Sequence, residues 1–438
     1  MKLLFISLIL ILLQNCSFDK KSGIWKDESQ TVDKKKKIFE GFIDLNSEQK
    51  IFNQIIDSGQ NLKLYSKPKV FRKLNDHSLD EINNVNFGYK ELNFQSLKSK
   101  KLSKNRIQEN ILFDNNNLIF SDNKGNIVIY SVEEEKILRR FNFYKKTHKS
   151  IDKNLNLLIK DNIIYVADNL GYIYAYNYNE NKVKWAHRHK IPYRSNIKIY
   201  KKNIIISDQN NNLFILDQNT GKQIKKIPTE QVNFNNNFKN NIVVGDKRFF
   251  FLNSYGSLYS FNEKMNVDWF INLNKRIKEN PSNIFYSNQI LISKKNIFIL
   301  TNDQFYVIDK LRGAILFKKN FGSNITPLIF KDHLFLINTN DLFIAFSLEE
   351  KKIINKFDLK NKFRSNTKLR KISNKIKNLK IVNNSIYLFL EDHYIVRINF
   401  NSEIEEVFNI KSNLNSNPIF IDNALLYLNN KNKLIILN

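Results

Sequence analysis

Few residues in this 438-residue sequence have the types and spacing needed for chemistry. The one local histidine cluster is "HRH", in which His187 and His189 would project from the same face of a β-strand. Two imidazoles could begin a metal site, but no third ligand stands near them in the sequence. Packing between strands or exposure at the surface explains this pair better, so we predict no metal and no cofactor.

Other catalytic patterns are missing as well. The sequence holds one cysteine, Cys16, which excludes an intramolecular disulfide and a cysteine-based zinc cluster. No Ser-His-Asp arrangement can be defended, and "NTGKQ" at 219–223 lacks the upstream glycine of a phosphate-binding loop. Most Asp and Glu residues stand in turns, where their side chains hydrogen-bond the local backbone. The sequence therefore predicts no catalytic residue and no enzyme.

The N-terminus has the pattern of a secretory signal. Lys2 precedes an apolar run from Leu3 to Leu13. As a helix this run would rise only about 16 Å, too short for a bilayer core of about 30 Å. We therefore expect residues 1–15 to be a signal peptide. No later segment is long and apolar enough to span a membrane.

Cys16 follows this run immediately. The stretch resembles the lipobox of bacterial lipoproteins, with Leu13 at the −3 position and Cys16 as the acylated residue, although Asn15 replaces the usual Gly, Ala or Ser. Ser17, in place of Asp, follows the cysteine, and in the sorting pattern of lipoproteins this implies the outer membrane. We expect lipidation at Cys16, palmitate included, with each buried CH₂ contributing about 0.8 kcal/mol to anchoring on the periplasmic side.

The composition is that of a globular, strongly basic protein. Hydrophobic residues make up 42% of the chain, and the formal net charge is +28. Such a charge could attract nucleic acid or anionic membranes. The lysines are scattered over the whole sequence, however, and no nucleic-acid module accompanies them. We expect a solvated basic surface and no nucleic-acid partner, with attraction to acidic partners or lipid headgroups as the alternative.

The chain repeats itself at intervals of 38 to 52 residues, about 44 on average. Eight segments of the form apolar-x-x-apolar followed by Ser, Asn or Asp define the copies. They are "IVIYS" (127–131), "IYAYN" (173–177), "LFILD" (213–217), "LYSFN" (258–262), "FYVID" (305–309), "FIAFS" (343–347), "IVRIN" (395–399) and "LIILN" (434–438).

Each copy contains four strand-like segments. Two apolar runs precede the defining segment, often with a glycine turn before it, and a fourth run follows it. Regular recurrence of four strands favours an all-β, eight-bladed β-propeller of antiparallel blades over a sandwich or barrel, and we place it at residues 85–438. Residues 16–84 would be a lipid-anchored tether, with a possible short helix at Ser47–Ser58.

The last copy ends at Asn438, after its third strand. A ring closes best when one blade is shared by both ends of the chain, because no edge strand is then left exposed. We expect an N-terminal strand to complete blade eight, with Tyr89–Leu97 as the donor and Lys69–Leu74 as a competitor. Deletion of 85–97 should then destabilise the whole ring, whereas trimming 20–60 should not.

The turn chemistry resembles one known family of repeats. "LDQNTGKQI" at 216–224 and "GYIYAYNYNENKVKW" at 171–185 follow the pyrroloquinoline-quinone-type pattern Gly-x-aliphatic-x-Ala-aliphatic-Asp-x-x-Thr-Gly-x-x-x-Trp. Gly171, Ala175 and Trp185 are in register with it, and Trp269 stands in the equivalent place of a further copy. Eight such copies behind a lipoprotein signal resemble the outer-membrane protein assembly factor BamB family.

This resemblance implies a non-catalytic lipoprotein subunit of the outer-membrane β-barrel assembly machinery. Its partner would be the periplasmic domains of the barrel-inserting subunit, and unfolded outer-membrane proteins could also bind. In the family the contact uses loops that enter the fourth and fifth repeats, which correspond here to Ile227–Phe238 and Asn274–Asn283.

Two alternatives remain open. Quinone-dependent dehydrogenases share the repeat, but many carry an adjacent cysteine pair and calcium-ligating carboxylates around the cofactor, and this chain has only Cys16. A scaffold or glycan-binding propeller of another envelope complex would have the same overall pattern.

Overall fold

The computed structural model describes residues 56–57, 62–74, 85–90, 96–231, 239–274, 284–370, 375–410 and 412–438. The chain divides into two compact units, Met1–Gln54 and Ile55–Asn438, and every described residue lies in the second. The expected signal peptide and Cys16 lie outside the described residues. Of the expected helix Ser47–Ser58, only Ile56–Asp57 is described, and this pair forms strand β1.

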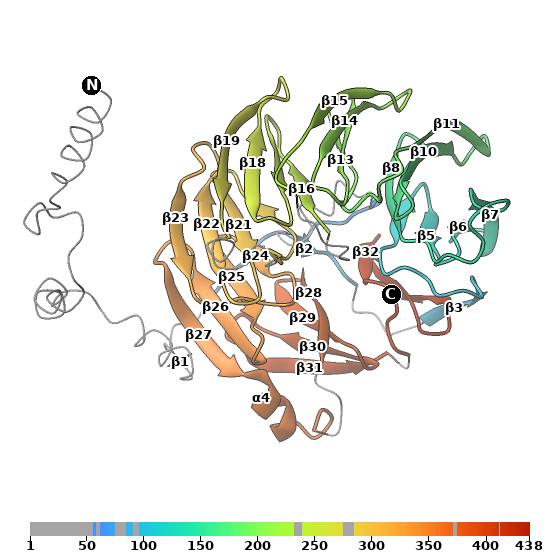
Figure 1. The fold of residues 1–438 in the computed structure, drawn as a ribbon. Helices are drawn as coiled ribbons and strands as arrows, with labels where there is room; N and C mark the ends of the chain where they lie inside the picture. The colour runs from blue at the N-terminus through green and yellow to red at the C-terminus, as the bar shows by residue number, and fades with distance from the viewer. Residues whose placement is uncertain are drawn as a thin grey trace, which may run out of the picture. The chain divides into compact units, whose positions relative to one another are not determined.

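The described unit is an eight-bladed β-propeller, as the sequence predicted (Figure 1). Each blade contains an antiparallel sheet of four strands. In blades one to seven these strands are consecutive in the chain, and blade eight takes its fourth strand from an earlier part of the chain. Blade one contains β4 (Leu112–Asp114), β5 (Asn117–Ser121), β6 (Asn126–Ser131) and β7 (Lys136–Asn142). Blade two contains β8 (Leu155–Lys160), β9 (Ile163–Asp168), β10 (Tyr172–Asn177) and β11 (Lys182–Arg188). Blade three contains β12 (Lys198–Tyr200), β13 (Asn203–Ser207), β14 (Leu213–Asp217) and β15 (Gln223–Ile227). Blade four contains β16 (Asn241–Val244), β17 (Phe249–Leu252), β18 (Ser257–Phe261) and β19 (Val267–Asn272).

The second half of the ring has the same order. Blade five contains β20 (Leu291–Ile292), β21 (Asn296–Leu300), β22 (Phe305–Asp309) and β23 (Ile315–Lys319). Blade six contains β24 (Leu328–Phe330), β25 (His333–Ile337), β26 (Leu342–Ser347) and β27 (Lys352–Asp358). Blade seven contains β28 (Ile376–Val382), β29 (Ser385–Leu390), β30 (Tyr394–Ile398) and β31 (Ile404–Asn409). Blade eight contains β32 (Ile419–Ile421), β33 (Ala424–Leu428), β34 (Lys433–Leu437) and β3 (Ser96–Lys101).

Burial separates the outer strand from the three inner ones in most blades, although β27 of blade six is partly buried. In blade two, β9 and β10 are buried along almost their whole length, whereas β11 is mostly exposed. The inner strands consist largely of β-branched and aromatic residues, which suit a sheet packed on both faces. A register shift between the third and fourth strands recurs in blades one to seven. Such bulges increase the local twist of a blade.

The turn after the second strand has the same chemistry in six blades. An Asp or Asn there accepts hydrogen bonds from the backbone N–H groups two and four residues later. These residues are Asp122, Asp168, Asp208, Asn253, Asn338 and Asn429. The expectation that acidic side chains serve the local backbone of turns is confirmed at Asp122, Asp168 and Asp208.

Two tryptophans join neighbouring blades by packing on glycines. A Cβ atom added to Gly221 would lie 2.4 Å from Cε3 of Trp185, which belongs to the preceding blade. Gly313 meets Trp269 in the same way, at 2.6 Å. Both glycines have positive φ angles of about 70°. The Thr-Gly-x-x-x-Trp spacing noted in the sequence thus reflects contacts between one blade and the next.

The ring is closed by contacts at all eight junctions between blades. Hydrophobic clusters join neighbouring blades, and Phe305 packs against Phe346, with ring centroids 5.9 Å apart, where blade five meets blade six. In blade eight, β3 pairs antiparallel with β34, and Leu97 lies opposite Ile436. The outer edge of the last blade is therefore a strand from the N-terminal part of the chain.

This strand is not the one that the sequence indicated. Of the proposed donor Tyr89–Leu97, only Ser96 and Leu97 belong to β3, and the competing stretch Lys69–Leu74 does not belong to it at all. Outer strands are largely exposed, so they need no apolar alternation, and the search for alternation selected the wrong segments. The described residues Lys69–Leu74, together with Tyr89 and Lys90, lie against the inner parts of blades seven, eight and one instead.

Residues 62–74 and 85–90 pack against the ring, and from Lys69 on they follow the inner edges of its blades. Strand β2 (Asn86–Phe87) pairs with β28 in parallel, and Leu74 forms a bridge to Phe113 of blade one. Leu74 and Phe87 are buried in the cluster that joins blades seven, eight and one. Figure 1 shows β2 near the middle of the ring. Contacts with the ring therefore begin before residue 85, within the stretch expected to be a tether.

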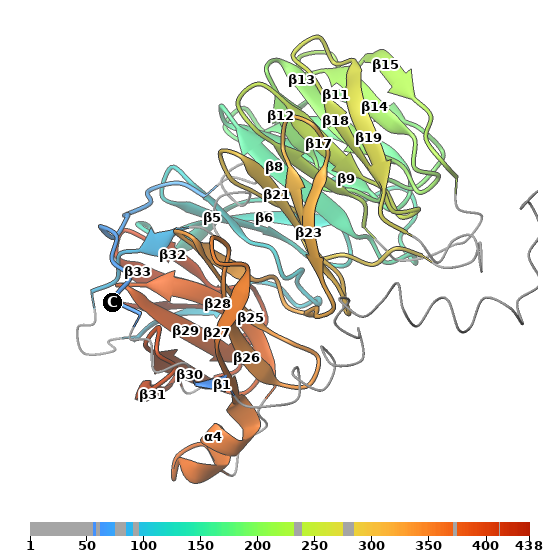
Figure 2. The ribbon, with the colours of Figure 1, turned by 90° about the vertical axis from the view of Figure 1, so that its left-hand side faces the viewer.

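Two small elements complete the described structure. β1 adds to the outer edge of β27 as a fifth strand. The helix α4 (Leu359–Ser365) follows β27 and projects from the ring (Figure 2), with Asp358 as its N-cap and Leu359 and Phe363 buried. Within the described ranges, no helix has the length and apolar character needed to cross a bilayer.

Candidate functional site

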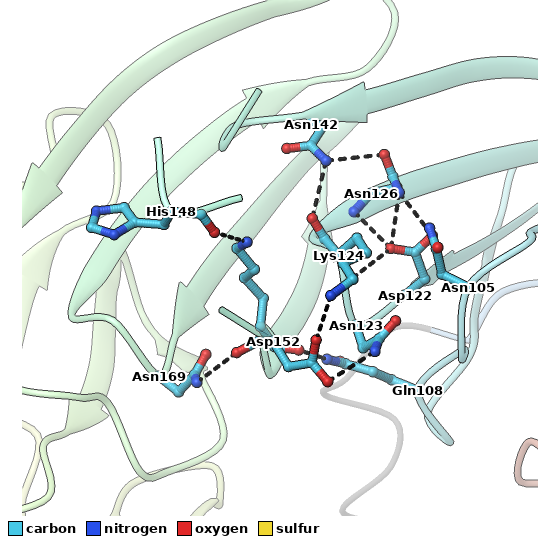
Figure 3. A network of polar contacts seen from close by, with 11 residues as sticks. Asn105, Gln108, Asp122, Asn123, Lys124, Asn126, Asn142, His148, Asp152 and Asn169 are labelled. Carbon is cyan, nitrogen blue, oxygen red and sulfur yellow. Dashed lines mark hydrogen bonds and ion pairs between the residues drawn. The ribbon is translucent and has the colours of Figure 1, made fainter. Parts of the chain in front are cut away.

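A network of polar contacts surrounds the acidic side chains of blade one and the loop that follows it (Figure 3). The carboxylate of Asp122 is fully buried and accepts hydrogen bonds from Ser103 Oγ at 2.8 Å and from Asn105 Nδ2 at 3.0 Å. It also accepts from the side-chain and backbone nitrogens of Asn126. All these partners shape the turn and the segment entering the blade, so Asp122 has a structural role.

The same network continues to the loop that enters blade two. Asp152 accepts from Lys124 Nζ at 2.8 Å and from Asn123 Nδ2 at 3.0 Å, and its backbone oxygen accepts from Asn169 (Figure 3). Hydrogen bonds from Lys124 and Asn123 hold the pKa of the Asp152 carboxyl below its usual value. An exposed, ionised carboxylate of this kind ties one turn to the next and is not suited to proton transfer at neutral pH.

Asp168 is a buried acidic residue whose carboxyl pKa is raised. Burial raises the pKa of its carboxyl, while hydrogen bonds from Tyr144 and from the backbone N–H groups of Leu170 and Tyr172 oppose that rise. Burial likewise raises the pKa of Tyr144. Shifted groups in a cleft can mark an active site. Here, however, Tyr144 and Asp168 pack between blades one and two, and their hydrogen bonds fix the blades against each other.

A small pocket on blades two and three offers little room for a ligand. Its lining residues are Asn154, Asn156, Asn169, Tyr193, Arg194 and Lys239. The free space accommodates about one water molecule. An organic cofactor the size of a quinone does not fit in it.

The two histidines singled out from the sequence contact blade three separately. His187 Nε2 lies 2.9 Å from the backbone oxygen of Thr220, and His189 Nε2 lies 3.0 Å from Asp208 Oδ2. The ring of His189 also stacks on Tyr193. No group of three or more His, Cys, Asp or Glu side chains in the described parts of the chain could hold a metal ion.

The two loops expected to contact a partner are described only at their bases. Residues 232–238 and 275–283 lie outside the described ranges. The base of the first loop is firmly held, because Glu230 accepts hydrogen bonds from Tyr259 Oη at 2.7 Å, Ser257 Oγ at 2.8 Å and Asn253 Nδ2 at 3.1 Å. Burial acts to raise the pKa of Glu230, but these hydrogen bonds hold it below its usual value.

Exposed apolar side chains are most numerous on blades three to five, which these two loops connect. Seven of the eleven large apolar side chains that are exposed in the described ranges lie between residues 224 and 316. Six of them stand on or beside the outer strands β15, β19 and β23, and we call them the apolar rim: Ile224, Val267, Phe270, Leu311, Ile315 and Leu316. Phe270 is 59% exposed and stacks on Tyr259, whose hydroxyl binds Glu230. Grouped exposed apolar side chains are typical of protein-binding surfaces.

Sequence reasoning did not find the apolar rim. Exposure of Phe270 or Leu316 depends on their place in an outer strand, and the repeat pattern alone treats every strand as buried. A large apolar residue in the fourth strand of a repeat is the signal that could have revealed it. Cys16, the other site residue expected from the sequence, lies outside the described residues.

This fold defines a class of protein: the eight-bladed β-propellers built from pyrroloquinoline-quinone-type repeats. Its polar clusters shape turns. Residues 95–319, just over half of the chain, match the family model described as outer membrane protein assembly factor BamB. The chain therefore belongs to the BamB family.

Solved structures with similar folds agree with this. The crystal structure of BamB from Moraxella catarrhalis superposes with a TM-score of 0.59 at 14% identity, covering 78% of this chain and 98% of that chain. The computationally designed Ika8 protein superposes with a TM-score of 0.55 at 11% identity, with the same coverage of 78% and 98%. At such low identity these likenesses concern the fold alone. No curated protein sequence matches this chain.

Proposed function

We propose that this protein is a non-catalytic lipoprotein subunit of the outer-membrane β-barrel assembly machinery. It would hold the periplasmic domains of the barrel-inserting subunit and assist the insertion of outer-membrane proteins, which it could also contact in unfolded form. Membership of the BamB family is the observation that carries this proposal. The use of Asp122, Asp152 and Asp168 in turns and blade contacts supports a binding role over catalysis.

The partner surface that we propose is the apolar rim together with the loops at Ile227–Phe238 and Asn274–Asn283. The first loop leaves from β15 and the second from β19, the strands that carry Ile224 and Phe270. Protein interfaces usually centre on aromatic and aliphatic anchors that lose water on binding, surrounded by polar groups. Phe270, next to the Tyr259–Glu230 hydrogen bond, offers both kinds of group.

The proposed location is the periplasmic face of the outer membrane. Support comes from the signal-like run before Cys16, from Ser17 after it and from the envelope proteins that give the family its description. Acyl chains on Cys16, added after removal of residues 1–15, would supply the anchor.

Pull-down from cross-linked envelopes tests this function. A tagged, lipidated protein should recover the barrel-inserting subunit. The double variant Phe270→Glu/Leu316→Glu should reduce recovery by about tenfold or more, because it places charge in the centre of the proposed contact. Recovery of a peptidoglycan enzyme or a glycan in place of the barrel-inserting subunit would overturn the proposal.

A matched control uses exposed apolar residues far from this rim in the ring order. Leu97 on β3 and Ile151 before blade two are 52% and 44% exposed. The variant Leu97→Glu/Ile151→Glu adds the same charge and should recover the subunit as well as the unchanged protein does. An equal loss in both variants would contradict the assignment of the contact to blades three to five.

A further inference from the structure

Three neighbouring outer strands carry only positive charge. Strand β3 reads "SLKSKK", β7 reads "KILRRFN" and β11 reads "KVKWAHR", so each has three Lys or Arg residues and none has Asp or Glu. All nine of these basic residues are exposed. We call them the basic rim.

The three strands follow one another around the ring. They are the outer strands of blades eight, one and two, and Figure 1 shows them along one side. Arg140 Nη2 on β7 donates to the backbone oxygen of Leu102, just after β3, at 2.8 Å. The basic rim is therefore continuous across the junction of blades eight and one.

Few carboxylates neutralise these charges. In the described part of the chain, Lys136 pairs with Glu134 at 2.6 Å and Lys184 pairs with Glu180 at 2.7 Å. The other seven basic side chains of the rim form no ion pair there. Among the other outer strands, β15 and β23 also carry only lysines, two each, whereas β31 carries Glu405 and Glu406, which both pair with Arg397. Basic residues are thus most numerous on the outer strands of blades eight, one and two, with three on each strand and no more than two on any other outer strand.

The basic rim also lacks the apolar centre of a protein interface. Leu97 is the one exposed large apolar side chain in the described residues of its three strands, whereas the apolar rim lies on blades three to five. Protein interfaces are depleted in lysine and centre on apolar anchors. A surface of solvated Lys and Arg without such anchors suits the headgroups of anionic lipids, which attract basic residues through their surface potential.

We propose that the basic rim docks on an anionic phospholipid surface, with phosphate headgroups as its ligands. This inference rests on the proposed location in the envelope. Each cation near such a surface adds roughly fivefold to the affinity, less at high salt. A lipid anchor would raise the local concentration of headgroups, so weak contacts could still orient the ring. Blades three to five would then face away from the membrane, toward a protein partner.

Vesicle co-sedimentation tests the proposal without the anchor. The probe is the mature chain with Cys16→Ser, mixed with vesicles of phosphatidylcholine alone or of phosphatidylcholine with phosphatidylglycerol. We expect binding to the phosphatidylglycerol vesicles only, and loss of that binding at high salt. Absence of binding to anionic vesicles, or equal binding to both kinds, overturns the proposal.

Two charge-reversal variants locate the surface. The rim variant carries Lys98→Glu, Lys101→Glu, Arg139→Glu and Lys182→Glu. The control variant changes net charge equally with Lys222→Glu, Lys226→Glu, Lys294→Glu and Arg312→Glu, all exposed residues of blades three and five. We expect the rim variant to lose at least about tenfold in vesicle binding and the control to change by less than about threefold.

Equal loss in both variants would mean diffuse charge and would contradict a defined rim. Binding of the rim region to an acidic protein, with no response to phosphatidylglycerol, would contradict it as well. The lipidated rim variant should still recover the barrel-inserting subunit in the pull-down. The lipid contact and the proposed function are therefore tested separately. Failure of that pull-down in the unchanged protein would count against the function and not against the lipid contact.

Discussion

At the scale of single residues, contacts between glycine and tryptophan join one blade to the next. Asp217 and Thr220 shape the turn that ends in Gly221, and Trp185 of the preceding blade covers that glycine. The spacing of these residue types could be predicted from the sequence as a repeat signature. The contact itself could not, because a repeat pattern does not say which blade a side chain packs against.

Gly221→Ala should therefore lower the free energy of unfolding by about 1–3 kcal/mol. A Cβ there would lie 2.4 Å from the Trp185 ring, and φ is +69°. Urea unfolding followed by tryptophan fluorescence measures the loss. Gly245→Ala is the control, since its Cβ would meet nothing closer than 3.4 Å and no positive φ is required. Similar losses at both positions would contradict the packing argument.

Lys380 on β28 gives a pH-dependent prediction. Burial lowers the pKa of its ammonium group to about 7. Between about pH 7 and 10.5 the unfolded chain binds a proton that the folded chain does not, so this group makes unfolding costlier as pH rises, by up to about 1.4 kcal/mol per unit. Below about pH 7 the lysine is charged in both the folded and the unfolded state. The folded state then bears the full free-energy cost of burying the charged ammonium group.

Lys380→Met should remove this dependence and stabilise the fold most near neutral pH and below. Urea unfolding of the unchanged protein and of the variant, each at about pH 6 and about pH 9, gives the change in unfolding free energy with pH for the two proteins. Lys431, an exposed lysine in a turn, is the control position for the same substitution. A slope that is unchanged in Lys380→Met would show that burial of this group does not control the pH response.

At the scale of strands and segments, the inner strands could be predicted from the sequence more reliably than the outer ones. The inner strands of the blades have dense apolar patterns, so their number and order could be predicted. The donor strand of blade eight could not be located, because β3 is an outer strand with few apolar side chains. The predicted donor Tyr89–Leu97 was misjudged for the opposite reason: its first residue, Tyr89, is apolar because it is buried at the inner edge of the ring.

Replacing residues 96–101 by a Gly-Ser linker of equal length should lower the free energy of unfolding by about 2–5 kcal/mol, because β34 then loses its outer partner strand and keeps only β33. Thermal unfolding by circular dichroism measures the change. Deletion of 20–54, which belongs to the separate first unit, should leave the melting temperature unaltered. Melting of both variants at the same temperature as the unchanged protein would argue against closure through β3.

The inner segment yields a second element-scale test. Phe87 is 3% exposed and packs on Phe71 and Phe420, with ring centroids 5.4 and 5.3 Å away. Phe87→Ala should cost about 3–5 kcal/mol of stability. Tyr65 belongs to the same N-terminal stretch but is 67% exposed, so Tyr65→Ala should cost no more than about 0.5 kcal/mol. Chemical denaturation of the two variants decides whether this stretch is part of the folded ring.

The whole molecule separates its surface chemistry by blade. The net charge and the propeller fold could both be predicted from the sequence, but the distribution of charge could not. It depends on which strands are outermost, and the structure shows the most basic outer strands on blades eight, one and two and most of the exposed large apolar side chains on blades three to five. This separation supports a ring with one side for lipid and another for protein.

The most direct test of the proposed function is site-specific photo-cross-linking in living cells. A photo-reactive amino acid at position 270 should form an adduct with the barrel-inserting subunit, because Phe270 lies in the apolar rim. The same group at position 97, also exposed, should not. Adducts with that subunit from position 97 alone, or from neither position, would contradict the account.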